Sequence, residues 1–211
     1  MKFSHYIFFW ENYLRTVYSL TDMPGNTPNY DRYDVVRCFL RLNGRKSRTS
    51  LARSLDLGEG TMRAILGQLK AAGVVDANRP GHSLSAKGAK VHDRIGKLLE
   101  YQTVRTGVLE GPHSIAFLNR TSRRNRAGIQ ERDIAIRMGA RAALILTYTD
   151  RLRAGGIGKL DTKPLDVLFD YRKNNTLVIT SAYNKATAER AGLAVCESIS
   201  RSLRNAFSTL C

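Results

Sequence analysis

The sequence predicts an α+β fold in two domains. Between residues 31 and 102, apolar side chains recur every three or four positions, which is the spacing of helices that bury one face. After residue 105, continuous apolar runs such as residues 142–148 alternate with helical patterns, which is typical of a small sheet covered by helices. The chain has 211 residues, a length that suits two small domains with cores of their own.

The first segment of the chain differs from the rest. Its apolar residues recur every three or four positions from Phe3 to Val17, and a stretch rich in proline, glycine and asparagine follows. Charged residues such as Glu11 interrupt the apolar run, so we do not expect a signal peptide. We expect an amphipathic helix that packs on the first domain or on a second copy, and then a linker. The sequence therefore divides into residues 1–30, 31–104 and 105–211.

The charge balance is the strongest global signal. The chain has 34 Lys and Arg residues against 18 Asp and Glu, a net charge of +16. Residues 31–104 hold 14 basic and 7 acidic residues, and residues 105–211 hold 18 and 9, so both domains are basic. Such an excess favours a polyanionic partner, nucleic acid before an acidic membrane surface, although a merely basic soluble protein is the alternative.

Cysteine usage and hydropathy indicate a cytoplasmic protein. The cysteines Cys38, Cys196 and Cys211 are odd in number and far apart, which fits free thiols in a reducing compartment. The sequence contains no run of 18 apolar residues, so we expect no membrane partner.

The first domain is predicted to contain four helices and a hairpin. Ser47 and Ser85 are suitable N-cap residues for two of the helices, and a turn is predicted at residues 78–83 between two short β-branched or apolar stretches. The predicted helices span residues 31–42, 47–57, 58–73 and 86–102. The resulting order is helix, helix, tight turn, helix, hairpin, helix, which is that of a winged helix-turn-helix domain.

The helix at residues 58–73 has an unusual outer face. Its inner stripe is apolar, but the opposite positions carry almost no side chain: Gly60, Ala64, Gly67 and Ala71. An interior glycine costs a helix about 1 kcal/mol relative to alanine. A helix without bulk on this line could bring its backbone close to the floor of a DNA groove, while the alternative is that the exposed glycines are merely tolerated.

Two stretches resemble a known family. Residues 47–75, SRTSLARSLDLGEGTMRAILGQLKAAGVV, and residues 84–88, LSAKG, are similar to the winged-helix module of prokaryotic transcription regulators of the MarR and DtxR types. Met62 departs from the pattern, in which valine is usual. The whole layout, with a basic second domain, resembles an uncharacterised group of archaeal winged-helix proteins. This resemblance implies binding of double-stranded DNA.

The resemblance also implies which residues meet the DNA. Those on the recognition helix are expected in the major groove, those at the start of the second helix at a phosphate, and those of the wing beside the duplex. For each residue, a solvated surface position is the alternative, and some winged helices serve instead as protein-binding modules. The expected contacts are, in these three groups, Gly60, Thr61, Arg63, Ala64, Gly67 and Gln68; Ser47, Arg48 and Thr49; Arg79 and His82.

The second domain is expected to be a small α/β sandwich. Strands are predicted at residues 115–119, 142–148, 165–171 and 176–183, with helices at residues 129–140 and from Asn184 onward. The small-residue run at residues 191–195 should let the last helix approach the sheet closely. In one-component regulators such a domain senses a small molecule or assembles the oligomer, so an effector is a candidate ligand here.

No motif indicates catalysis. The glycine-rich stretch at residues 154–159 lacks the spacing of a phosphate-binding loop, and Leu160 stands where serine or threonine would bind magnesium. The histidines show no spacing typical of metal ligands, so we expect no enzyme, no metal and no cofactor.

The function predicted is that of a sequence-specific DNA-binding transcription regulator. We expect a homodimer, with the helix at residues 86–102 as one candidate interface. The basic run at residues 120–126 is either an extension of the DNA footprint or a solvated loop. The alternative function is that of a non-regulatory accessory protein that binds duplexes without sequence preference.

Overall fold

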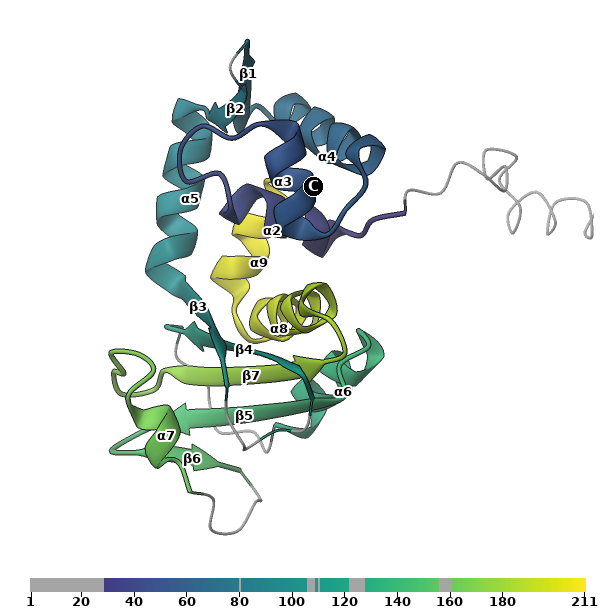
Figure 1. Ribbon diagram of the computed structural model, residues 1–211. Helices are drawn as coiled ribbons and strands as arrows, with labels where there is room; N and C mark the ends of the chain where they lie inside the picture. The colour runs from purple at the N-terminus through teal and green to yellow at the C-terminus, as the bar shows by residue number, and fades with distance from the viewer. Residues whose placement is uncertain (1–28, 80, 106–108, 110, 122–127, 156–160) are drawn as a thin grey trace, which may run out of the picture. The chain divides into compact units, whose positions relative to one another are not determined.

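The computed structural model describes residues 29–79, 81–105, 109, 111–121, 128–155 and 161–211 (Figure 1). Residues 32–211 form one compact unit of mixed α+β structure, with a helical region that is N-terminal in sequence and a C-terminal sheet, as predicted. The expectations for the N-terminal amphipathic helix, for Pro80 at the hairpin tip, and for most of the basic run and the glycine-rich stretch concern residues outside this described part.

The helical region follows the predicted order of elements. The side chains of Ser47 and Ser85 cap helices by accepting hydrogen bonds from the amides of Ser50 and Gly88, as their positions in the sequence predicted. Between the second and third of its helices, Asp56 adopts a left-handed conformation that turns the chain. The elements are α2 (Arg32–Leu40), α3 (Arg48–Leu55), α4 (Glu59–Ala71), β1 (Val75–Asn78), β2 (Gly81–Leu84) and α5 (Ala86–Leu98).

The sheet has five antiparallel strands in the order β3-β4-β7-β5-β6. Helices α6 and α8 contact each other and cover one face, while the segment that contains α7 packs on a buried apolar cluster on the other face. The elements are β3 (Leu99–Val104), β4 (His113–Asn119), α6 (Ile129–Arg137), β5 (Ala142–Tyr148), β6 (Leu152–Ala154), α7 (Lys163–Asp166), β7 (Thr176–Ala182), α8 (Lys185–Ile199) and α9 (Arg201–Ser208).

Helix α8 lies very close to the sheet. Gly192 faces the ring of Phe117 on β4, and a Cβ atom at Gly192 would lie 2.0 Å from that ring. The small-residue run at residues 191–195 therefore serves the close packing that was predicted for it.

The structure corrects three predicted elements. The helix expected to reach residue 102 ends at Leu98, because residues 99–104 pair with β4 along their whole length and so belong to the sheet. The strand expected at residues 165–171 is wrong, because Leu165 lies in the short helix α7. The Leu165 carbonyl accepts a hydrogen bond from Tyr171 Oη, so the two ends of the expected strand lie close together. The final helix breaks at Ser200, which caps α9 by accepting from the amide of Leu203.

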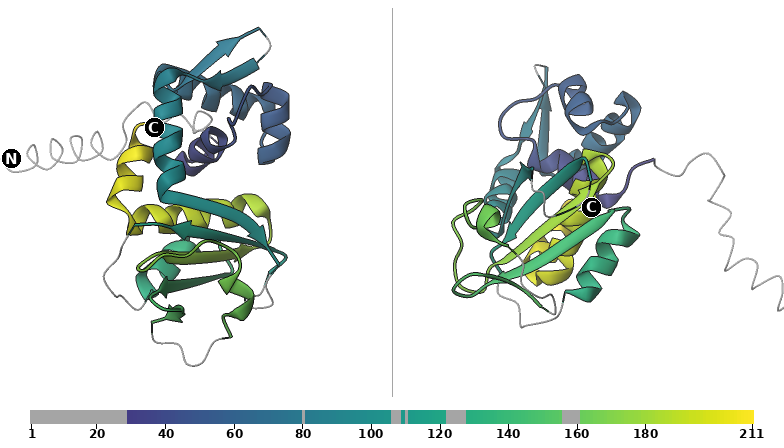
Figure 2. Two further views of the ribbon diagram at one scale, coloured as in Figure 1. Left: turned by 90° about the vertical axis from the view of Figure 1, so that its left-hand side faces the viewer. Right: turned by 60° about the horizontal axis from the view of Figure 1, so that its bottom comes forward.

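The break at Ser200 changes where the chain ends. Helix α9 leaves the sheet and packs against α5 of the helical region (Figure 2). Its apolar side chains Leu203, Ala206 and Phe207 are buried there. The C-terminal residues thus complete the core of the helical region, although they lie more than a hundred residues away from it in the sequence.

A buried ionic cluster joins the helical region to the sheet. Arg37 of α2 is 2% exposed, and its Nε donates to Glu189 Oε2 of α8 at 2.7 Å. The same guanidinium also donates to Asp34 and to the carbonyl of Leu55 at the end of α3. Arg41 donates to both oxygens of Glu189, at 2.6 and 2.8 Å. One carboxylate on the sheet-covering helix therefore holds two cations of the helical region.

Loss of the Glu189 carboxylate should destabilise the protein strongly. Replacement Glu189→Ala leaves the buried Arg37 with Asp34 as its one remaining described anion and takes both carboxylate contacts from Arg41. Breaking a buried ion pair in this way costs about 3–5 kcal/mol. Urea unfolding measures this change in the free energy of unfolding. The control is Asp93→Ala, which removes the exposed pair of Asp93 with Lys97 and should cost less than about 1 kcal/mol. Equal effects of the two variants would contradict the role given to Glu189.

Candidate nucleic-acid interface

The outer face of α4 is bare. Gly60, Ala64, Gly67 and Ala71 are all exposed, in the positions opposite the buried stripe that includes Met62. Cβ atoms placed on the two glycines would meet no described atom within 4 Å. We call these four residues the α4 ridge. Its exposure agrees with the prediction from the helical periodicity of the sequence.

Cationic side chains flank the α4 ridge. Arg63 and Lys70 are exposed on α4, and Arg63 forms no ion pair with any described residue. Because an exposed, unpaired guanidinium gives up no internal contact when it binds an anion, Arg63 is well placed for an external ligand.

The side chains at the start of α3 already have hydrogen-bond partners within the protein. Ser47 uses its hydroxyl as the N-cap of α3. Arg48 Nη2 lies 3.2 Å from Glu59 Oε2, and Thr49 Oγ1 donates to Glu59 Oε1 at 3.1 Å. Sequence reasoning missed Glu59, which begins α4 and brings a negative charge to the expected phosphate site. Its position in the first turn of a helix, where an acidic residue is favourable, was the available signal.

The β1–β2 hairpin lies beside these helices. The amide and carbonyl groups of His82 exchange hydrogen bonds with those of Lys46, at 2.8 and 2.9 Å, and tie the hairpin to the residues before α3. Gly81 follows the hairpin tip with a φ of +142° and lies so close to the Lys46 carbonyl that no Cβ atom would fit. Arg79 is exposed at the end of β1, whereas His82 is half-buried.

Two of the expected contact residues do not face outward. Thr61 is only 9% exposed, because it lies one helical turn before the buried Ile65 and shares its face. This burial does not fit the expected contact of Thr61 with DNA. Gln68 is half-buried, and its Nε2 donates to the carbonyl of Leu210 at 3.5 Å, so the C-terminal end of the chain contacts its side chain.

Comparisons with known proteins give a fold and no function. Residues 33–90 match a family model described as "PH0730-like, N-terminal domain", and residues 111–199 match "Domain of unknown function (DUF4443)". The structure is similar to that of the hypothetical protein PH0730 from Pyrococcus horikoshii OT3, with a TM-score of 0.70 and 23% identity over 84% of this chain and 100% of that chain. The chain shares the fold of an archaeal hypothetical protein.

The matches cover the parts of the chain on which the site depends. The PH0730-like match extends from α2 into α5 and so includes the α4 ridge and the hairpin.

No curated protein matches the chain. Among the described helices, none is long and apolar enough to cross a membrane.

Burial and neighbouring cations lower the pKa of His82. Burial of the imidazole is the main cause, and the positive charges of Arg48 and Lys70 add to it, although a hydrogen bond with the Lys46 backbone opposes them. The Nδ1 atom of the ring is buried and has no hydrogen-bond partner among the described residues. His82 is therefore a neutral group at pH 7, and the cationic character of this surface comes from its arginine and lysine side chains.

The stability of the protein should consequently depend on pH through His82. Below the ordinary histidine pKa of 6.5, the unfolded chain takes up a proton that the folded imidazole resists, so the free energy of unfolding falls. Above that pH both states are neutral and the contribution disappears. Urea unfolding of wild type and His82→Gln at pH 7.5 and 5.5 tests this, with a smaller loss expected for the variant. An identical loss in both proteins would show that the pKa of His82 is not lowered.

Proposed function

We propose that the protein is a winged helix-turn-helix transcription regulator that binds double-stranded DNA, with α4 in the major groove and the β1–β2 hairpin as the wing. The observation that carries this proposal is the α4 ridge, an exposed helix face with only glycine and alanine. The order of the elements around it, the net charge of +16 and the cations beside it support the same proposal.

The shape of the α4 ridge suits a groove. The major groove of B-DNA is about 12 Å wide and admits a helix, whose diameter with side chains is about 10–12 Å. Without side-chain bulk at Gly60 and Gly67, the backbone of α4 can lie deeper than that of an ordinary helix. Arg63 then reaches a base edge from the side of the ridge, where arginine recognises guanine O6 and N7.

Phosphate contacts would come from the residues around α4. The exposed Arg79 extends from the hairpin, and Arg48 and Thr49 lie at the start of α3. The contacts of Arg48 and Thr49 with Glu59 are exposed to solvent, and an exposed ion pair stabilises a protein by only about 0–1 kcal/mol. A DNA phosphate can therefore replace Glu59 as the partner of Arg48. We place Gln68 outside the reading surface because of its contact with Leu210.

A non-regulatory accessory protein with the same fold is the second candidate. The high net charge favours it, because charge alone supplies binding without sequence preference. Regulation requires in addition that α4 discriminates between bases. A small-molecule effector would then bind at the sheet. Its effect would reach the helical region through the ionic cluster that joins α8 on the sheet to α2.

Selection from a random duplex pool, followed by salt titration of the enriched sequence, distinguishes the two. The proposed regulator should enrich a defined motif, and its affinity for that motif should exceed its affinity for unrelated duplexes by about 10³-fold or more. Binding to all duplexes with one affinity and a steep salt slope would identify the accessory protein instead. No detectable duplex binding at low salt would refute both.

Bulk on the α4 ridge should weaken this binding without unfolding the protein. A Cβ atom at Gly67 would meet no described atom within 4 Å outside the neighbouring backbone of its own helix, so the fold has room for Gly67→Leu, but the groove does not. We expect at least about tenfold weaker binding to the enriched duplex, equivalent to about 1.4 kcal/mol or more. The control is Ala89→Leu, at an exposed position of α5. Unchanged affinity of a folded Gly67→Leu protein would contradict the docking of α4.

Truncation of Arg63 should cost both affinity and specificity. Arg63→Ala removes a side chain that forms no ion pair with a described residue, so stability should stay within about 0.5 kcal/mol of wild type. Binding to the selected site should weaken by about 1–3 kcal/mol, and the preference at one base pair should relax. A uniform loss on all sequences would instead identify Arg63 as a phosphate contact.

A further inference from the structure

The two edges of the sheet are protected unequally. Strand β6 forms one edge, has only three residues, and carries an exposed cation at Arg153, with a second, Arg151, directly before it. Short strands and charges of this kind prevent pairing with another chain. Strand β3 forms the other edge with six residues, Leu-Glu-Tyr-Gln-Thr-Val, and has no lysine, arginine, proline or bulge. Natural proteins rarely leave such an edge unpaired.

The backbone of β3 has hydrogen-bonding groups that point away from the sheet. The amide of Arg120 donates to the carbonyl of Leu98, just before β3. This bond shows which residues of β3 direct their backbone groups toward β4 and which direct them away from it. In an antiparallel pair every second residue bonds to the neighbour, so Glu100 and Gln102 bond to β4. Tyr101 and Thr103 then direct their amide and carbonyl groups to the open edge. Both residues are exposed, and no described residue pairs with their backbones.

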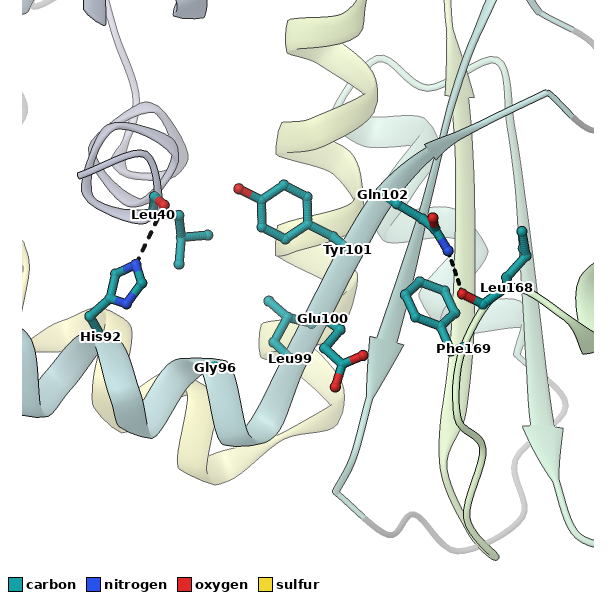
Figure 3. A pocket seen from close by; sticks show the side chains of 9 residues that line it. All are labelled: Leu40, His92, Gly96, Leu99, Glu100, Tyr101, Gln102, Leu168 and Phe169. Atoms are coloured by element: carbon teal, nitrogen blue, oxygen red, sulfur yellow. Dashed lines mark hydrogen bonds between the residues drawn. The ribbon is translucent and has the colours of Figure 1, made fainter. Parts of the chain in front are cut away.

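A hollow of about 440 Å³ runs along the same edge (Figure 3). It reaches both faces of β3, because some of its residues lie on the side of α2 and α5 and others on the side of the segment after α7. These are Leu40, His92 and Tyr101 on the first side, and Gln102, Leu168 and Phe169 on the second. An added strand suits this shape, because its side chains alternate between the two faces of the sheet.

We propose that the occupant is β3 of a second copy of this chain, paired antiparallel across a twofold axis. A twofold axis perpendicular to the strands sets two identical strands antiparallel, which continues the arrangement of all five strands. With the axis at Gln102, Tyr101 of each copy lies opposite Thr103 of the other, and these outward-facing backbones exchange hydrogen bonds.

Charge also favours a second copy at this edge. Two molecules with a net charge of +16 repel each other over most of their surfaces. Strand β3 contributes no cation, and its one anion, Glu100, is already paired with Arg120. The edge is thus a neutral strip on a basic protein. This dimer is independent of the DNA-binding proposal. Its interface is the open edge of strand β3, whereas the sequence suggested a helical interface at residues 86–102.

Sedimentation velocity on the full chain over a range of concentrations tests the dimer. Wild type should be dimeric, and Thr103→Pro should raise the dimer dissociation constant by about 30-fold or more, because each copy loses an intermolecular hydrogen bond. The substitution removes no bond to β4, since the Thr103 amide points outward. The matched control, Thr103→Val, keeps the amide and should remain dimeric. A dimeric, folded Thr103→Pro protein or a monomeric wild type would overturn the proposal.

Hydrogen exchange on the wild type gives an answer that needs no variant. The amides of Glu100 and Gln102 should be protected at all concentrations, because they bond to β4. The amides of Tyr101 and Thr103 should gain protection only at concentrations where the dimer forms. Fast exchange at Tyr101 and Thr103 in a sample that sediments as a dimer would place the interface elsewhere and overturn the proposal.

Discussion

The buried contact between Glu189 and Arg37 is the constraint on which the arrangement of the structure depends. Both side chains are nearly inaccessible to solvent, so each must keep its partner. Glu189 belongs to the helix that covers the sheet, and Arg37 also holds the end of α3 through the carbonyl of Leu55. The position of α2 and α3 on the sheet is thereby set, and α4 packs against both with its ridge left outward.

Local signals predicted much of the fold. Ser47, Ser85 and Asn184 cap the helices that follow them, and the apolar run at residues 142–148 is strand β5. Prediction failed where distant contacts decide the structure. The helical pattern of α5 was expected to continue to residue 102, but pairing with β4 makes residues 99–104 a strand. Packing against α5 turns α9 away from the sheet.

In the candidate site, too, local features were predicted and contacts between distant residues were not. The exposure of the α4 ridge and of Arg63 follows from the helical periodicity of the sequence alone. Arg79 is also exposed, as expected for a residue at the tip of a hairpin. The role of Glu59 and the contact of Gln68 were not predicted because their partners are distant in sequence: Arg48 lies 11 residues from Glu59, and Leu210 lies 142 residues from Gln68. A single sequence carries no signal of such pairs. Recognition of DNA depends on the side chains of this face and not on the fold that the chain shares with the archaeal hypothetical protein.

Methylation interference on the duplex that selection enriches tests the docking of α4 in the major groove most directly. Dimethyl sulfate methylates guanine at N7, which lies in the major groove, and adenine at N3, which lies in the minor groove. If the α4 ridge enters the major groove beside Arg63, methylation of guanines within the site should block binding. Interference confined to adenine N3, or absent from the whole site, would contradict the account.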